Sequence, residues 1–392
     1  MIASSVPTPP SSSTAPDPAS APTGSAPSAS APASAATPVS SSPLSPLAAL
    51  WDSKPGLREI VWTVGTALLF LGLCAGFFLA LGKHPLELLW QVALGAFGDK
   101  YSTTETLVKT TPILFCALAA AVPARLGLLS VGQSGQFYLG AFVGTFFVLR
   151  FPAGTPSFVA LPAMLLLAGA GGAAWGLVPG ALRARVGVNE TLTTLLFNYV
   201  GALLVDWAVY GPWRDPNNLG WPATPSFPDA AKLPSFFGSR LHAGLFLAIA
   251  LAVGLHILLT RTRWGLMLRV MKSNRKLAEG AGMRYGLHVA AVMALGGALA
   301  GLAGICETSA IQGRLQSGVA ANYGITGFLV AWMAGQHLIK ILPLALIMGA
   351  ILSASDALQL FAELPSAIAV VMQAMLFLSV LGVAGWRKRK GA

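Results

Sequence analysis

The residues in this sequence that could do chemistry are isolated polar side chains inside long apolar stretches. The stretch 126–145 reads LGLLSVGQSGQFYLGAFVGT, with Gln133, Ser134 and Gln136 where lipid would demand apolar residues. Irregular backbone at membrane depth survives only against protein or a water-filled cavity. Two interpretations are open: a broken helix that lines a solute path, and close helix packing through the glycines. Packing does not account for two glutamines, so the pattern favours a path.

A second polar group lies in the stretch GVNETLTTLLFNY. Asn189 at an N-cap would bond free helix amides, and Glu190 would favour the positive end of the helix. Capping is therefore one interpretation of these two residues. Thr191, Thr194 and Asn198 follow i, i+3, i+7 spacing and share one helix face. A polar stripe on a spanning helix is expected to face a bundle interior or a pore.

The stretch LGGALAGLAGICETS combines glycines with an acid. Gly297, Gly301 and Gly304 favour close helix contact, and Glu307 follows at the outer end. An intramembrane acid is a functional candidate by default, and the alternative is a solvated carboxylate at the membrane boundary. The same two interpretations apply to Asp206, Asp356 and Glu363.

A second glycine-broken segment, 313–335, carries Asn322, Tyr323 and Thr326. Interrupted segments in corresponding halves of a chain are typical of internal-repeat transporters with a site near the bilayer midplane. We therefore add Tyr323 to the predicted path.

The elements that must position these residues are membrane helices. Of 392 residues, 55% are hydrophobic and 10% charged, against about 25% charged in an average soluble domain. This composition excludes a soluble globular protein, a disordered chain and a disulfide scaffold. A span needs about 20 mostly apolar residues. The sequence predicts an all-α polytopic membrane protein with about ten such spans, at 60–82, 105–123, 126–149, 157–180, 188–210, 241–260, 286–306, 321–337, 339–358 and 364–383.

The basic residues predict the orientation. With both termini cytoplasmic, most of the Lys and Arg residues fall on the inner side, which accounts for the net charge of +11 without nucleic acid. The expected location is a membrane, in contact with lipid. On the outer side we expect an ordered loop at 211–240 and an amphipathic interfacial helix at 84–100.

Two further regions lie on the predicted cytoplasmic side. Residues 1–49 are rich in Ser, Pro and Ala and predict a disordered tail, so residues 50–392 form the membrane domain. Residues 261–285 predict short amphipathic helices that end at a Gly-x-Gly break. A lipid-facing polybasic loop is one interpretation of this segment, and a helix that docks into a groove of a soluble partner is the other.

No catalytic constellation is present in the sequence. There is no GxxxxGK[ST], HExxH or GxSxG pattern, and the five histidines are scattered. We predict no catalytic residue, no ATP site in this chain, and no metal or cofactor.

Several motifs together resemble the permease subunit of bacterial ABC importers, in the branched-chain amino acid and simple-sugar permease superfamily. RLGLLSVGQSGQFYLGA is similar to its FNIGxEGQ segment, with Ser134 in place of Glu. GVNETLTTLLFNY resembles GxNExxxTLxxNY of the nucleoside-type permeases that work with a basic-membrane-protein lipoprotein. TRWGLMLRVMKSNRKLAEGAGM is similar to the cytoplasmic coupling segment, GGALAGLAGICE to the helix that follows it, and YGITGFLVAWMAGQH to YGFTGIAVALLGxxHP, with Leu338 in place of Pro. The resemblance covers about 57–385.

The resemblance implies a type II ABC importer fold with two permeases, which form a heterodimer in the nucleoside systems. It also implies an ABC ATPase with tandem domains and an external substrate-binding lipoprotein. The expected function is nucleoside import. The alternatives are sugar or branched-chain amino acid import by the same machinery, an ion-driven secondary transporter, and a polytopic membrane enzyme. The expected substrate path comprises Gln133, Ser134, Gln136, Asn189, Glu190, Thr194, Asn198, Glu307 and Tyr323. The expected ATPase-coupling residues are Arg269, Asn274, Ala278, Glu279, Gly280 and Gly282.

Overall fold

The computed structural model describes residues 55–152, 154–217, 220–236 and 238–389. By its internal contacts the chain divides into two units, Met1–Leu57 and Arg58–Ala392. The tail predicted at 1–49 lies outside the described residues. In the second unit, the regular elements of the described residues are all helices, so the prediction of an all-α protein is confirmed.

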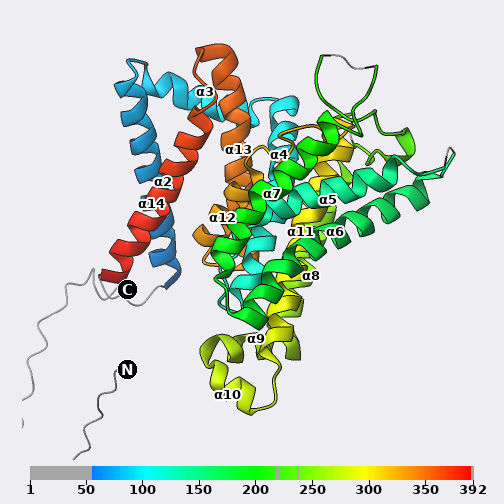
Figure 1. The fold of residues 1–392 in the computed structure, drawn as a ribbon. Coiled ribbons are helices and arrows are strands. Elements are labelled where there is room, and N and C mark those ends of the chain that lie inside the picture. The colour runs from blue at the N-terminus through cyan, green and yellow to red at the C-terminus, as the bar shows by residue number, and fades with distance from the viewer. Residues whose placement is uncertain (1–54, 153, 218–219, 237, 390–392) are drawn as a thin grey trace, which may run out of the picture. The chain divides into compact units, whose positions relative to one another are not determined.

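Eight helices of the described residues are long and apolar enough to cross a membrane, which confirms a polytopic membrane protein (Figure 1). Each corresponds to a span predicted from the sequence. At 1.5 Å per residue, about 20 residues cover the hydrocarbon layer. The eight are α2 (Pro55–Ala80), α4 (Lys100–Ala124), α6 (Ser157–Val186), α7 (Glu190–Tyr210), α8 (Ala243–Arg261), α11 (Tyr285–Glu307), α13 (Leu338–Ala362) and α14 (Ile368–Arg389).

The other two predicted spans, 126–149 and 321–337, are not continuous membrane helices, so the count of ten is not confirmed. Helix α5 (Gln133–Val148) follows an irregular stretch at 128–132, and α12 (Tyr323–Met333) has only 11 residues. Both pack among the long helices, α5 on α6 and α11, and α12 on α4. The predicted interruptions are therefore present, and each leaves backbone groups that neighbouring elements must satisfy.

Helix α11 lies at the centre of the bundle and packs closely against α6 and α5 through glycines. A Cβ added to Gly297 would lie 2.2 Å from the carbonyl oxygen of Gly172, and one on Gly304 would lie 2.1 Å from that of Phe137. Only glycine allows these backbones to approach so closely, and small residues make such interfaces favourable in lipid. The close contact predicted from the glycine spacing is confirmed.

The loop after α7 is ordered by hydrogen bonds to the chain that follows α11. Thr224 donates its N–H to the carbonyl of Leu315 (2.9 Å) and accepts the N–H of Leu315 through its hydroxyl (3.0 Å). Ser309, in the π-helical turn η2 (Thr308–Gln312), accepts from the N–H of Leu233 (3.0 Å). The expected ordered cap is present, but its one described helical turn is the 3-10 turn η1 (Asp229–Ala231).

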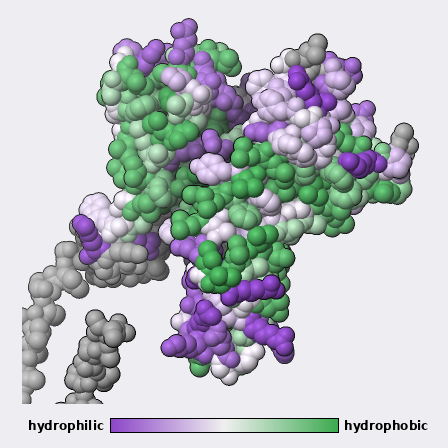
Figure 2. All heavy atoms as spheres, viewed as in Figure 1, coloured by the Kyte–Doolittle hydropathy of each residue, from purple (hydrophilic) through white to green (hydrophobic). Residues whose placement is uncertain are grey.

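Short helices lie at both ends of the bundle. Helix α3 (Pro85–Phe97) runs across the ends of its neighbours, with Leu86 and Trp90 exposed, as expected of an interfacial helix (Figure 1). At the opposite end, α9 (Arg263–Ser273) and α10 (Arg275–Gly280) form the predicted pair of short helices. Figure 2 shows hydrophilic residues over α9 and α10 and hydrophobic residues over the middle of the bundle.

Candidate translocation path and coupling helices

The irregular stretch 128–132 is held by polar side chains of α7. The N–H of Leu129 donates to Oε1 of Glu190 (3.2 Å), and its carbonyl accepts from Oγ1 of Thr191 (3.0 Å). In a membrane interior, unpaired N–H and C=O groups cost several kcal/mol each. The α7 side chains therefore stabilise a non-helical backbone at membrane depth.

Thr194 and Asn198 continue the same set of contacts one and two turns further along α7. The hydroxyl of Thr194 accepts from the N–H of Val131 (3.2 Å). The amide of Asn198 donates to the carbonyl of Val131 (2.8 Å) and accepts from the N–H of Gly135 (2.7 Å), in the first turn of α5. The predicted polar stripe does share one face of α7, and that face binds the broken segment.

At the start of α7, the capping interpretation is confirmed for Asn189. Its side chain is exposed and accepts the N–H of Thr191 (2.9 Å). Glu190 instead forms an ion pair with Arg183 at the end of α6, with 3.2 Å between Oε2 and Nε. Glu190 therefore connects α6, α7 and the broken segment.

The polar residues of α5 point towards two neighbours. Gln133 and Gln136 are buried, and Oε1 of each has no hydrogen-bond partner within the part of the chain that the structure describes. Gln136 lies beside α6, since its Nε2 would be 3.2 Å from a Cβ added to Gly176. Ser134 packs against Gly324 of α12, where an added Cβ would clash with the serine.

A polar cavity of 410 Å³ lies between α4, α12, α13 and α14. Helix α12 begins at this cavity, and Ala321 and Asn322 just before it have φ of 36° and 65°. Positive φ is unfavourable for residues other than glycine and is often found at functional sites. The polar side chains in the lining are Lys109, Asn322, Tyr323, Thr326, Ser355, Asp356, Gln359, Ser366 and Gln373.

The charges in the cavity lining are paired. Lys109 of α4 forms an ion pair with Oδ2 of Asp356 on α13 and also donates to the carbonyl of Leu352 (3.2 Å). Thr326 donates to Oε1 of Gln373 on α14 (3.1 Å). The Lys109–Asp356 pair therefore adds no net charge to the cavity. The cavity offers hydrogen-bonding groups that suit an uncharged polar solute.

Glu307 does not line this cavity. It is buried at the end of α11, next to the π-helical turn, and its Oε2 has no partner among the described residues. Of the residues predicted for the path, Tyr323 lines the cavity, Asn189 caps α7, and the others lie on α5, α7 and α11. Lys109 was missed, although a lysine inside an apolar span requires a partner such as Asp356.

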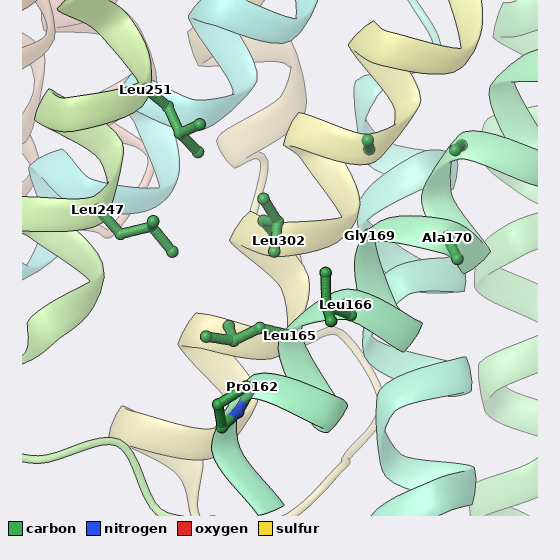
Figure 3. Close-up of a pocket in the computed structure, with 10 residues that line it drawn as sticks. Pro162, Leu165, Leu166, Gly169, Ala170, Leu247, Leu251 and Leu302 are labelled. Atoms are coloured by element: carbon green, nitrogen blue, oxygen red, sulfur yellow. The ribbon is translucent and has the colours of Figure 1, made fainter. Parts of the chain in front are cut away.

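A second hollow, of 590 Å³, has a different character. It lies between α6, α8 and α11, where Leu165, Leu247 and Leu302 point towards one another (Figure 3). Its lining residues, from Pro162 to Leu302, carry no polar side chain. This hollow therefore offers nothing to bind a polar solute.

The predicted coupling segment is connected to α4. Lys272 near the end of α9 donates to the carbonyl of Ala124, the last residue of α4 (3.1 Å). Arg125 follows, and burial together with the nearby Arg269 lowers the pKa of Arg125. Arg269 itself donates to the carbonyl of Gly265 one turn earlier (3.4 Å).

The remaining residues that were predicted for coupling shape α10. Asn274 caps the helix by accepting the N–H of Leu277 (3.0 Å), and Ala278 is fully buried. Glu279 pairs with Arg275 (2.8 Å). Helix α10 ends at Gly280, and Gly282 has a φ of +81°, so the predicted Gly-x-Gly break is confirmed.

Long apolar helices around two broken segments, a polar cavity at one of them and a basic helix pair at one end define a polytopic membrane transport subunit. Residues 102–381 match the family described as the permease component of the branched-chain amino acid transport system. The match covers more than half of the chain, which therefore belongs to this permease family.

Known ABC transporter permeases are similar in sequence to this chain. The glucose ABC transporter permease protein of Haloferax volcanii is 30% identical, over 77% of this chain and 82% of its own length. The guanosine ABC transporter permease protein of Bacillus subtilis is 28% identical, over 83% and 96%. The nucleoside ABC transporter permease protein of Lactococcus lactis subsp. cremoris is 28% identical, over 76% and 84%. The motif-based resemblance is confirmed, and as an ABC transporter permease the chain works with a separate ATPase subunit.

Proposed function

We propose that this chain forms the translocation path of an ATP-driven nucleoside importer. The carrying observation is the polar cavity where α12 begins, because it provides hydrogen-bonding groups within the membrane-spanning helices of a permease. Two of the relatives described above are named for guanosine or nucleosides, and a third is named for glucose. Nucleosides and glucose share neighbouring sugar hydroxyl groups, which such a cavity can bind.

The proposed assembly contains four kinds of component. This permease pairs with a second, different permease, a tandem-domain ABC ATPase, and a substrate-binding lipoprotein outside a bacterial inner membrane. In this proposal both termini and the α9–α10 segment are cytoplasmic, because Lys and Arg residues concentrate in the sequence at 261–285 and 387–390. Affinity comes mainly from the lipoprotein, so binding inside the membrane is weak and transient.

Helix α4 provides a route from the ATPase to the cavity. Its last residue, Ala124, accepts a hydrogen bond from Lys272 in the coupling segment, and Lys109 of the same helix lines the cavity. ATPase closure would move α9 and α10, and α4 would transmit that movement to the Lys109–Asp356 pair. In this proposal Tyr323 lines the cavity, and Gln133, Gln136 and Glu307 lie along further parts of the path. Glu190, Thr194 and Asn198 shape the path by bonding residues 129–135. Ser134 packs α5 against α12, and Asn189 caps α7.

Uptake of labelled uridine, ribose and leucine by the complete importer in membrane vesicles tests this proposal. ATP-dependent uptake of uridine in excess of ribose and leucine is the expected result. ATP-dependent uptake of leucine or ribose alone would show that the importer carries that substrate rather than nucleosides. Uptake driven by an ion gradient in the absence of the ATPase would overturn the ABC mechanism.

A further inference from the structure

One wall of the polar cavity consists of three polar residues on α13. Ser355 and Gln359 are four residues apart and so lie on the same helix face, and Asp356 adjoins Ser355. All three line the cavity together with Lys109 from α4. These residues therefore present a hydroxyl, a carboxylate and an amide to whatever occupies the cavity.

Asp356 is held as an acceptor. Lys109 pairs with its Oδ2, and the side chain of Lys109 is only 13% exposed whereas that of Asp356 is 60% exposed. A carboxylate accepts hydrogen bonds and donates none, so Asp356 offers an acceptor to a ligand hydroxyl. Lys109 pairs with Oδ2 only, and the side chain of Asp356 stays accessible, so Oδ1 remains available to a ligand. The cavity therefore holds an oriented acceptor that suits hydroxyl groups and disfavours a phosphate.

Ser355 supplies a second, independent observation. It is 1% exposed and lines the cavity, yet its hydroxyl has no hydrogen-bond partner in any described segment. A buried polar group without a partner is rare and costly. A ligand hydroxyl in the cavity would satisfy it.

We propose that Ser355, Asp356 and Gln359 form a subsite for two neighbouring hydroxyl groups of a sugar ring. A carboxylate accepts from both hydroxyls of such a pair, while the serine and the amide can each donate or accept beside it. This inference rests on the proposed function, because it assigns the ribose of a nucleoside to this wall. It names α13 as the element that distinguishes sugar-bearing substrates from branched-chain amino acids.

The test compares two nucleosides that differ only in the sugar hydroxyls. ATP-driven uptake of labelled uridine and labelled 2′,3′-dideoxyuridine is measured in vesicles that contain the complete importer, with wild type, Ser355→Ala, Asp356→Asn and Ser353→Ala. Lipoprotein, ATPase and second permease are identical in all preparations, so a changed uridine-to-dideoxyuridine ratio belongs to this chain. Ser353 is the matched control, because its hydroxyl donates to the carbonyl of Gly95 on α3 (3.1 Å) rather than lining the cavity.

We expect Ser355→Ala to lower the ratio at least threefold and Asp356→Asn at least tenfold, mainly through slower uridine uptake. Ser353→Ala is expected to keep the wild-type ratio. A wild-type ratio in both cavity variants would overturn the subsite. Should Asp356→Asn fail to assemble because Lys109 loses its partner, Ser355→Ala decides the question alone.

Failure of the proposed function gives a different result. If wild type does not take up uridine, the same preparations are tested with labelled ribose and glucose. Uptake that falls in Ser355→Ala and Asp356→Asn but not in Ser353→Ala would support the subsite while rejecting a nucleoside substrate. Uptake that no variant alters, or no uptake of any of these compounds, would overturn the subsite as well.

Discussion

At the scale of single residues, the α7 side chains show how polar groups in a membrane helix can support another segment. Thr191, Thr194 and Asn198 were predicted to share a face that lines a bundle interior or a pore. That face lies towards the bundle interior and bonds the backbone of Leu129, Val131 and Gly135, and we propose that the residues act on substrate through the position of α5. Their spacing predicted the shared face, but the partner lies more than 60 positions away in the sequence.

Replacing Asn198 by Ala tests this supporting role. The change removes bonds to both Val131 and Gly135 and leaves buried backbone groups unpaired, so we expect a loss of about 1–3 kcal/mol in unfolding free energy. Asn189→Ala on the same helix removes only an exposed cap and is expected to cost about 1 kcal/mol or less. Thermal unfolding in detergent micelles measures both losses. A loss for Asn189→Ala that equals or exceeds that for Asn198→Ala would contradict the supporting role of Asn198.

His242, at the start of α8, predicts a pH dependence of stability. It is 1% exposed, and its Nδ1 accepts the N–H of Gly244 (3.2 Å). Burial, with a smaller contribution from Arg240, lowers the pKa of His242 to about 4. In the unfolded chain the pKa is about 6.5. Between these values the unfolded chain binds the extra proton, so stability falls as the pH decreases from about 6.5 to about 4.

Because of His242, the free energy of unfolding is expected to fall by roughly 2 kcal/mol between pH 7 and pH 5. His242→Asn keeps an N-cap acceptor but does not titrate, so it is expected to lose most of this dependence. Thermal unfolding midpoints at the two pH values measure the effect. An equal shift in the variant and in wild type would assign the pH dependence to other groups.

At the scale of elements, the bundle contains helices that pack closely against one another and two helices, α5 and α12, that are too short to span the membrane. α6, α5 and α11 meet through glycines, while α5 and α12 are short and begin at the buried residues Gln133 and Tyr323. The glycine pattern predicted the contacts of α11 because small residues have few other uses at membrane depth. It did not predict the partners, since each glycine opposes a residue far away in the sequence.

Gly297→Val tests the contact between α11 and α6. The added side chain would collide with the backbone of Gly172, which cannot move aside, so we expect loss of folded, monodisperse protein. Gly254→Val on α8 is the matched control, because no atom lies within 4 Å of its added Cβ. Size-exclusion profiles after detergent extraction compare the two. Similar profiles for both variants would show that the α6–α11 contact tolerates separation.

Gly282→Val tests the turn after α10. Its φ of +81° strains any side chain, and a β-branched one most, so we expect α10 to shift relative to α11. The predicted consequence is at least a fivefold increase in ATP hydrolysed per uridine imported by the complete transporter. Gly238→Val carries the same backbone strain, with a φ of +60°, in the loop at the opposite end. An unchanged ratio for Gly282→Val, or an equal increase for both variants, would reject a specific coupling role.

At the scale of the whole molecule, the proposed orientation in the membrane can be tested by labelling variants with one introduced cysteine each. The native Cys74, Cys116 and Cys306 are buried and free, so they give little background. Ser273→Cys lies in the exposed end of α9, and Ser226→Cys lies in the exposed loop after α7. An impermeant maleimide is expected to label Ser226→Cys in intact cells and Ser273→Cys only after permeabilisation. The opposite pattern would reverse the orientation.

The sequence by itself determined the membrane class, the positions of eight helices, the two interruptions and the permease family. These are local properties, because length, hydropathy, glycine spacing and motif order are all readable along the chain. The tertiary structure decided which polar residues meet. Lys109 and Asp356 are separated by 247 positions but form one ion pair, and Ser355 joins them in the cavity. A lysine in an apolar span has few polar groups within reach, and only the packing of α4 against α13 decides that Lys109 meets Asp356.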